Sequence, residues 1–429
     1  MRMQRAAMIL VHRMLWERFN VEDTVVSAYY KRCWGDYGFV ATVAISLEDG
    51  AKARIRLLQA TTFQRRIHAF CRQVFAPSRG SCCRSFAFHT RDSKDIQVWI
   101  RAAEKRSVRE LSIVIDTLES PPVVELPRSL YRSCRMLVTL KLCNAVLVDD
   151  AAYPFSFPSL KKLSLESIKY PNDVFLDKLL SGCPVLEDLV VRQCPGDNVP
   201  IVRVRMLHLK SLALGTAEDR AEGDPHGFVI DAPSLECLDI DDYDSGSCVI
   251  VNKLSKIWKA RLHTGGPHNE KLVGSITSAK RLCLCLPNPK NVYPVSTVFH
   301  RLVDLEICTC QTEWLNLLMR VLSDSPKLQS LTLRKGHRYD DGVDVPGPCW
   351  NEPSSVPECV STTLKTFEWR IYEGTEEEKE VVAFILRNGS CLENVTINLD
   401  GICLEKGVEM IKALSFLPRR SPTCRITFD

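Results

Sequence analysis

Apolar residues recur along this chain in a short phrase, L-x-x-L-x-L, whose clearest copies begin at Leu160, Leu186, Leu209 and Leu235. Side chains alternate between the two faces of a β-strand, so the second and third apolar residues of each phrase face one side and the residue between them faces the other. One strand cannot bury such an apolar side alone. The pattern therefore predicts strands that stack on one another around a continuous core.

The middle apolar residue of each phrase defines a register along the chain. Most steps between these residues are 22 to 29 residues long, which is the spacing of leucine-rich repeats. We therefore predict an α/β protein, a leucine-rich-repeat solenoid (horseshoe) with a parallel sheet on its concave wall. The register residues are Leu111, Leu140, Leu163, Leu189, Leu212, Leu238, Ala260, Leu282, Leu305, Leu331, Phe367 and Val395.

Proline punctuates the repeats. Pro158, Pro184, Pro233 and Pro326 each stand two residues before a repeat leucine. Proline cannot extend a preceding helix, so each of these residues ends a return segment and leads the chain into the next strand. This regular punctuation strengthens the prediction of a repeat array.

Changes in the pattern suggest limits for the parts of the chain. We expect a short helical segment at 1–35, a cap or atypical repeat at 36–116, repeats at 117–335, a surface loop or linker at 336–356, and a C-terminal α/β unit at 357–429. Helices are expected at 8–35, 63–74, 96–103, 379–388 and 405–416, and strands at 40–45, 86–88, 109–115, 364–370, 392–397 and 425–428. Two loops, 216–227 and 336–356, interrupt the rhythm.

Charge is unevenly distributed, although the net charge is only +4. Residues 1–109 contain 20 Lys and Arg against 9 Asp and Glu, whereas residues 110–429 contain 36 against 43. Such a basic segment could contact an acidic partner, a nucleic acid or a membrane surface, but a solvated basic face is the interpretation we favour. No basic run is interleaved with aromatic residues as in a nucleic-acid platform. No apolar run is long enough for a membrane span or a secretory signal, so we expect a protein of the cytoplasm or nucleus that is not secreted.

The cysteines do not predict a disulfide framework or a metal site. There are nineteen, an odd number, and they are scattered through the chain. In Cys283-x-Cys285 and Cys308-x-Cys310 strand alternation places both members on one face, but no matching C-x-x-C or H-x-x-x-H follows. We also find no Gly-rich phosphate loop, G-x-S-x-G or H-E-x-x-H. We therefore expect no metal, no cofactor and no enzymatic activity.

The residues between the repeat leucines form the candidate binding surface. They alternate with the core positions and so face the concave side as a polar strip of mixed charge, with an acidic centre at residues 239–244. Each residue alone is more simply a solvated strand residue; together they are the best candidate for recognising a protein target. They are Thr139, Lys141, Lys162, Ser164, Asp188, Val190, Ser211, Ala213, Cys237, Asp239, Asp304, Glu306, Ser330 and Thr332.

Several segments resemble the plant F-box/LRR-repeat/FBD-domain protein family. They are Leu160-Lys-Lys-Leu-Ser-Leu, residues 179–191 and residues 230–240 in the repeats, the FBD-like segment 359–399 with Leu364-Lys-Thr-Phe-Glu-Trp, and the closing residues 417–428. The resemblance covers roughly residues 86–429. It implies a substrate receptor, in which an F-box binds the Skp adaptor of a cullin-based ubiquitin ligase and the repeats hold the target.

The F-box itself departs from the family pattern. Residues 8–34 lack the opening Leu-Pro pair but are similar to a degenerate F-box, which would contact an adaptor through Ile9, Leu10, Leu15, Val21, Val25 and Trp34. A plain amphipathic helix pair is the alternative for this segment. The expected function is therefore substrate recognition in a Skp-cullin-F-box ligase, and the alternative is an interaction scaffold that recruits no ligase.

Overall fold

The structure is a computed structural model of the 429-residue chain. It falls into two units, residues 1–186 and 187–429. The predicted helix at 63–74 lies outside the described residues. The described residues are 26–28, 40–46, 52–58, 85–90, 96, 97, 100, 101, 103, 104, 107–115, 124–149, 155–193, 198–216, 226–242, 246–264, 270–286, 293, 297–310, 313–335, 350, 352–400 and 402–429.

The first unit contains a parallel sheet in the order β1-β4-β5-β6-β7 and a separate antiparallel pair, β2 and β3. The prediction of helix over 8–35 is wrong at β1, where the run Val-Ser-Ala pairs with β4 instead. The elements are β1 (Val26–Ala28), β2 (Val40–Ser46), β3 (Lys52–Leu58), β4 (Ser85–Thr90), β5 (Glu110–Ile115), α4 (Ser129–Ser133), β6 (Thr139–Val146), β7 (Lys162–Lys169) and α5 (Phe175–Ser181).

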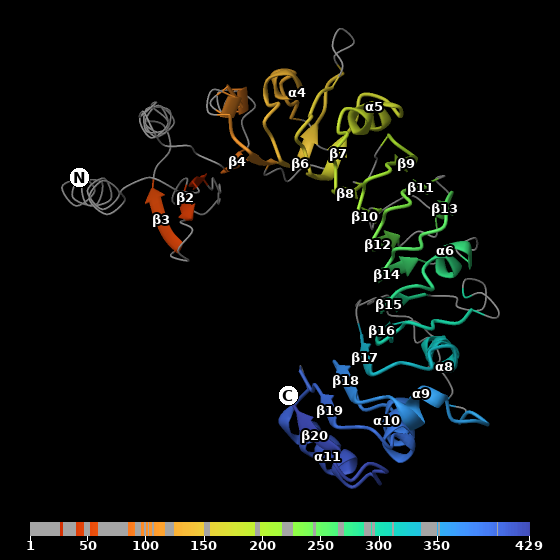
Figure 1. Ribbon diagram of the computed structural model, residues 1–429. Helices are drawn as coiled ribbons and strands as arrows, with labels where there is room; N and C mark the ends of the chain where they lie inside the picture. Colours follow the sequence, from red (N-terminus) through yellow and green to blue (C-terminus); the bar gives the residue numbers. More distant parts are fainter. Residues whose placement is uncertain are drawn as a thin grey trace. The chain divides into compact units, whose positions relative to one another are not determined.

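The second unit is built on a longer parallel sheet, in the order β8-β10-β12-β14-β15-β16-β17-β18-β19-β20. Helices α6, α8 and α10 lie on one side of this strand array (Figure 1). The strands are β8 (Asp188–Arg192), β10 (Ser211–Gly215), β12 (Cys237–Asp242), β14 (Lys259–Thr264), β15 (Arg281–Cys285), β16 (Asp304–Cys308), β17 (Ser330–Arg334), β18 (Thr366–Arg370), β19 (Asn394–Ile397) and β20 (Arg425–Phe428). The helices are α6 (Glu270–Ser275), α8 (Trp314–Ser323), α9 (Glu358–Thr362), α10 (Glu376–Asn388) and α11 (Leu404–Ser415).

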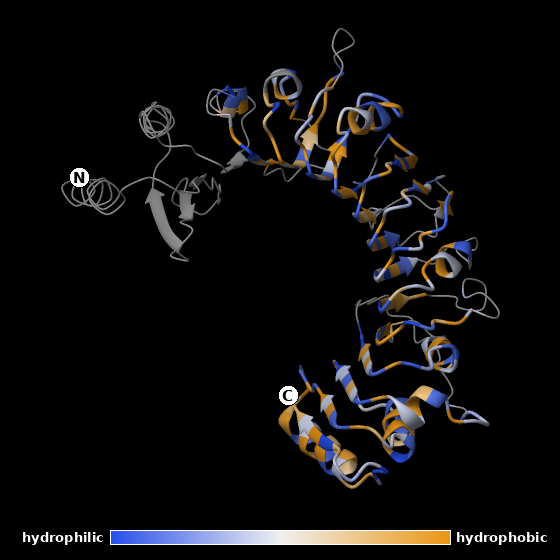
Figure 2. Ribbon diagram, viewed as in Figure 1, coloured by the Kyte–Doolittle hydropathy of each residue, from blue (hydrophilic) through white to orange (hydrophobic). Residues whose placement is uncertain are grey.

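The predicted register is confirmed within both units. Leu111 pairs with Leu140 and Leu140 with Leu163 in the first. In the second, the predicted residues pair in turn from Leu189 to Val395, and each is at most 3% exposed. Figure 2 shows the resulting alternation of apolar and polar residues along the strands. The leucine-rich-repeat solenoid of the α/β class is thus the fold of this chain.

The prolines lie in the turns that precede the strands. In each turn the amide of the repeat leucine donates to the carbonyl three residues earlier, for example from Leu235 to Ala232 at 3.1 Å and from Leu328 to Ser325 at 3.2 Å. Pro233 and Pro326 therefore occupy the second position of a four-residue turn, where their fixed φ is favourable. The sequence prediction for these residues is confirmed.

Adjacent repeats are also joined by a backbone contact at the start of each strand. The carbonyl of Lys280 accepts from the amides of Val303 and Asp304, at 2.9 and 3.1 Å. One repeat later, the carbonyl of Val303 accepts from Gln329 and Ser330, both at 2.9 Å. The same contact recurs along the second unit, and it involves no side-chain atom.

In three repeats the return segment between two strands of the large sheet is itself a strand and not a helix, and these three strands form a second, smaller sheet. It consists of β9 (Ile201–Arg205), β11 (Gly227–Asp231) and β13 (Ser247–Ile250), in the parallel order β13-β11-β9. The sequence prediction missed these strands and assigned Gly227 to a loop. Gly227 lies so close to β13 that a Cβ there would be 2.3 Å from the Ser247 carbonyl oxygen.

The C-terminal segment continues the same sheet, since β17 pairs with β18, β18 with β19 and β19 with β20. Helix α10 begins with a capping box: Thr375 Oγ1 accepts from the Glu378 amide at 3.3 Å, and Glu378 Oε2 accepts from the Thr375 amide at 3.2 Å. Glu378 Oε2 also accepts from the amides of Glu373 and Gly374. The expected strands and helices of this segment are confirmed to within a few residues, whereas the domain limits inferred from the sequence stay predictions.

None of the helices in the described part of the chain has the length and apolar character needed to cross a membrane.

Candidate functional site

The side of the second unit's sheet that faces away from the core is the candidate site. We call it the open face and define it by the residues one before, one after and three after each register residue of β8 to β18. They are Asp188, Val190, Arg192, Ser211, Ala213, Gly215, Cys237, Asp239, Asp241, Lys259, Arg261, His263, Arg281, Cys283, Cys285, Asp304, Glu306, Cys308, Ser330, Thr332, Arg334, Thr366, Glu368 and Arg370.

A first cluster of charges crosses β8, β12 and β14. Arg261 Nε lies 2.8 Å from Asp239 Oδ1, and its Nη2 lies 3.6 Å from Asp241 Oδ2. Asp241 is also paired with His263 Nδ1 at 2.9 Å and with Arg192 Nη1 at 3.9 Å. The cluster places two carboxylates between two guanidinium groups, so its charges largely balance.

These contacts alter the ionisation of the cluster. Burial alone would raise the pKa of Asp241, but the hydrogen bond and charge of His263, together with Arg261 and Arg192, outweigh it and hold the pKa below its usual value. Burial would lower the pKa of Arg261, but the hydrogen bond that it donates to Asp239, together with the charges of Asp239 and Asp241, raises it. Both groups are therefore charged at neutral pH.

A second cluster crosses β16, β17 and β18. Glu306 Oε1 lies 3.0 Å from Arg334 Nε, and Glu306 Oε2 lies 3.9 Å from Arg370 Nη1. Arg370 also donates to both oxygens of Glu368, at 2.7 and 3.0 Å. The hydrogen bond to Glu368 raises the pKa of Arg370. Between 27% and 45% of these four side chains is exposed, so the cluster remains accessible to a partner.

The structure divides the predicted site residues into four groups. Lys141 and Lys162 are exposed. Asp239, Asp304 and Glu306 take part in ion pairs. A further group is half-buried: Thr139, Asp188, Val190, Ser211, Ala213, Cys237 and Ser330. Ser164 and Thr332 are only 8% and 7% exposed. The expectation that the last two would be accessible is wrong, because both residues are buried.

The predicted acidic centre is also wrong at Asp242. This residue is 2% exposed, and its Oδ1 lies 3.1 Å from His226 Nε2 and 3.3 Å from the Thr216 hydroxyl. Asp242 is the last residue of β12 and follows Asp241, which lies on the open face. Because side chains alternate along a strand, Asp242 points to the core side. Tyr243 and Asp244 lie outside the described residues.

Sequence reasoning missed the basic half of the open face. Arg261, Arg334 and Arg370 supply most of the cations in the two clusters. Arg261 follows the register residue Ala260 by one position, while Arg334 and Arg370 follow Leu331 and Phe367 by three. Applying the offset of one to every strand, and adding the offset of three, would have found them.

The structure does not test the predicted adaptor contacts. Ile9, Leu10, Leu15, Val21, Val25 and Trp34 all lie outside the described residues.

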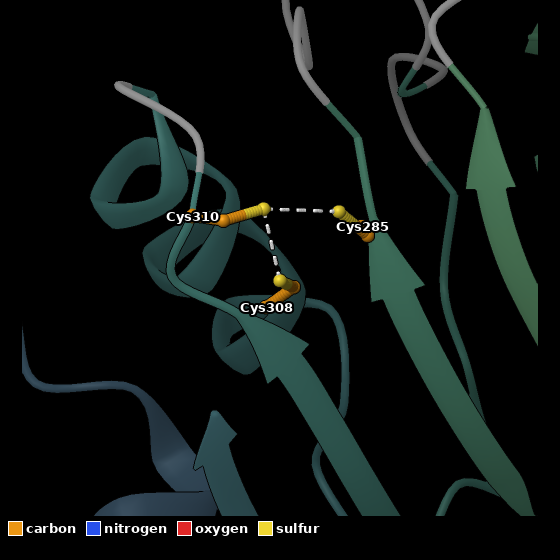
Figure 3. Close-up of side chains that lie close together, drawn as sticks. All are labelled: Cys285, Cys308 and Cys310. Carbon is orange, nitrogen blue, oxygen red and sulfur yellow. Dashed lines mark hydrogen bonds between the residues drawn. The ribbon is translucent and has the colours of Figure 1, made fainter. Parts of the chain in front are cut away.

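Three cysteine side chains meet at one edge of the open face. Cys310 Sγ lies 3.4 Å from Cys285 Sγ and 3.0 Å from Cys308 Sγ (Figure 3). Across the described ranges, no other group of three or more potential ligands from His, Cys, Asp and Glu is close enough to hold a metal ion. Sequence reasoning did not bring these residues together, although Cys285 and Cys308 each follow a register residue by three positions.

Comparison with known proteins adds to this geometry. Residues 352–397 match the FBD family, and residues 96–260 match the family described as FBD-associated F-box protein At5g56370, LRR repeats. Neither matched segment includes residues 1–35.

Arabidopsis thaliana proteins are similar over most of this chain. The probable FBD-associated F-box protein At1g32375 is 59% identical over 336 residues, which cover 78% of this chain and 79% of that protein. The putative FBD-associated F-box protein At5g56390 is 49% identical over 336 residues, covering 77% and 78% respectively. The F-box/FBD/LRR-repeat protein At5g56420 is 43% identical over 338 residues, covering 78% of each.

Proposed function

This chain belongs to the family of FBD-associated F-box proteins with leucine-rich repeats, and on that premise we propose that it is a substrate-recognition subunit of a Skp-cullin-F-box ubiquitin ligase. Its repeats form a protein-interaction module. In this proposal the open face of the second unit holds the target, while the N-terminal segment contacts the Skp adaptor. The protein would act in the cytoplasm or the nucleus.

The arrangement of charges on the open face is the observation that carries this proposal. Arginine and carboxylate side chains from different repeats hold one another in place, as in the pairs Arg261–Asp239 and Arg334–Glu306. Side chains that are already ordered lose less conformational entropy when a partner binds. Arginine is also enriched at protein interfaces because its planar group makes several directed hydrogen bonds.

The balance of charge suits a protein partner better than a nucleic acid. A nucleic-acid surface is strongly basic, because it must neutralise a row of phosphates. In both clusters, by contrast, each guanidinium group lies against at least one carboxylate. The expected target presents both acidic and basic side chains.

A first experiment tests the adaptor contact in the full chain. Purified Skp adaptor is incubated with the unaltered chain, with a Leu10→Asp/Leu15→Asp variant, and with Gln4→Ala as the matched control from the same segment. We expect the unaltered chain and the control to retain the adaptor and the double variant to lose it. If the unaltered chain fails to bind the adaptor, the ligase part of the proposal is wrong and the scaffold alternative replaces it.

A second experiment tests the target surface. Arg261→Glu and Arg334→Glu reverse charges on the open face, and Lys412→Glu reverses an exposed charge on α11 as a control. Proteins whose ubiquitylation depends on the unaltered chain are identified by quantitative mass spectrometry in cells. We expect both open-face variants to reduce that ubiquitylation at least about tenfold, corresponding to roughly 1.4 kcal/mol of binding, and the control to preserve it. Equal ubiquitylation with all three variants would exclude the open face as the target site.

A further inference from the structure

The three-cysteine cluster lies where two neighbouring repeats present the same position. Cys285 is the last residue of β15 and Cys308 the last residue of β16, and Cys310 follows two residues later. Cys285 and Cys308 are 4% and 5% exposed, and Cys310 is half-buried. The Sγ atoms all lie within 4.8 Å of one another (Figure 3). Cys310 gives solvent access to an otherwise buried site.

The separation of the sulfur atoms suits a shared metal ion. Zinc binds cysteine sulfur at about 2.3 Å, and tetrahedral angles then place the sulfurs about 3.8 Å apart. The two contacts made by Cys310 are 3.0 and 3.4 Å, so each sulfur would need to move by less than about 1 Å to reach this geometry. We propose that Cys285, Cys308 and Cys310 form a three-thiolate site for a soft divalent metal ion of the zinc class.

A positive charge in the same row of the sheet suits a cluster of several thiolates. Arg334 pairs with Cys308 across β16 and β17. Its positive charge offsets the net negative charge of three thiolates around one divalent ion.

A disulfide explains the cluster less well. A disulfide joins two sulfurs and leaves the third without a role, whereas all three lie together here. Cys310 Sγ lies 3.4 Å from Cys285 Sγ and 3.0 Å from Cys308 Sγ, so neither contact is set apart as a single oxidisable pair.

The test uses the full chain, purified with reductant and stripped with chelator. Cobalt(II) is titrated while sulfur-to-cobalt charge-transfer absorption and the intense visible bands of tetrahedral cobalt are recorded, and Zn²⁺ is then added to displace it. We expect one ion per chain, with release of about three protons. Cys285→Ser, Cys308→Ser and Cys310→Ser should each weaken binding at least about tenfold, and Cys391→Ser, an exposed cysteine outside the cluster, should not.

Circular dichroism of the metal-free variants identifies any that fail to fold. If the serine variants fail to fold, Cys310→Ala is a milder change, because Cys310 is only half-buried. Zn²⁺ should also raise the thermal midpoint of the unaltered chain and of Cys391→Ser but not of Cys310→Ala. An absence of charge-transfer absorption in the unaltered chain would overturn the proposal, as would absorption that persists in all three cluster variants. A chain that, after exposure to air, has a mass two hydrogens lower than that of the reduced chain, with the change mapped to these cysteines, would indicate a disulfide instead.

Discussion

Leu305 illustrates how much one side chain contributes to the array. It is fully buried at the register position of β16. Leu305→Ala should lower the free energy of unfolding by about 2–5 kcal/mol, because it removes apolar contacts and leaves a cavity. Val303→Ala is the matched control, since Val303 is 36% exposed two residues earlier. Chemical denaturation measures both, and an equal loss in the two variants would contradict the assigned register.

The buried pair of His226 and Asp242 makes a second residue-scale prediction. The two side chains are 5% and 2% exposed, and their ring nitrogen and carboxylate oxygen lie 3.1 Å apart. His226→Ala removes a partner from a buried carboxyl group, and we expect a loss of roughly 3 kcal/mol. His208→Ala, at an exposed position, should change stability by less than about 0.5 kcal/mol. Comparable thermal midpoints for the two variants would show that the pair adds nothing to stability.

Residue-level prediction succeeded where alternation alone decides the outcome. Leu189, Leu212 and Leu305 were assigned to the core from spacing, and they are buried. It failed at Asp242 and Thr332. Their exposure to solvent depends on where a strand ends and on how the side chains of adjacent strands pack around each residue. Neither property is contained in the local pattern of the sequence.

At the scale of elements, the start of α10 predicts a dependence of stability on pH. Glu378 is 7% exposed, and burial raises its pKa despite the hydrogen bonds from three amides. The pKa of Glu378 is thus higher in the folded than in the unfolded chain. Its contribution to the free energy of unfolding is therefore fully present below the unfolded pKa, about 4.3, and is lost as pH rises through the folded pKa. The thermal midpoint of the unaltered chain should therefore fall relative to that of Glu378→Gln as the pH rises above about 4.3.

Glu377→Gln is the control, because it removes one carboxylate from the same helical turn. A difference between the unaltered chain and Glu378→Gln that stays constant with pH, or that grows in the opposite direction, would contradict the raised pKa.

Elements of the large sheet were predictable because each carries two buried positions at a fixed spacing. The strands β9, β11 and β13 were not, since runs such as Val202-Arg-Val204 are too short for their period to be distinguished from an irregular return segment. Their identity as strands depends on pairing with one another across repeats. Such pairing is visible only once the repeats are stacked.

At the scale of the whole molecule, stability should be transmitted between nearest repeats. In a repeat array each strand contacts only its neighbours, so damage to one is felt most by those beside it. Leu331→Ala in β17 should therefore reduce hydrogen-exchange protection in β16, β17 and β18 more than in β10. Hydrogen-exchange mass spectrometry of the full chain measures this. A uniform loss of protection from β10 to β18 would show that the second unit unfolds as one cooperative block.

The candidate site was predictable only in outline. The sequence indicates which strand positions leave the core, but a binding surface also depends on which side chains from different repeats meet. Arg261 with Asp239, and Cys285 with Cys308, are 22 and 23 residues apart. They become neighbours because they occupy equivalent or adjacent positions in successive repeats. Residues 1–25 and 29–35 lie outside the described residues, and the role proposed for the N-terminal segment rests on the adaptor experiment.

The backbone contact between repeats, in which one carbonyl accepts from two amides of the next repeat, has a consequence for how the family can diversify. Since atoms common to every amino acid make this contact, it remains when open-face side chains are exchanged. Under the proposed function, substitutions such as those at Arg261 or Glu306 would therefore change the target surface while the contact between repeats is retained. The same property makes the protein a practical starting point for engineering new binding specificities.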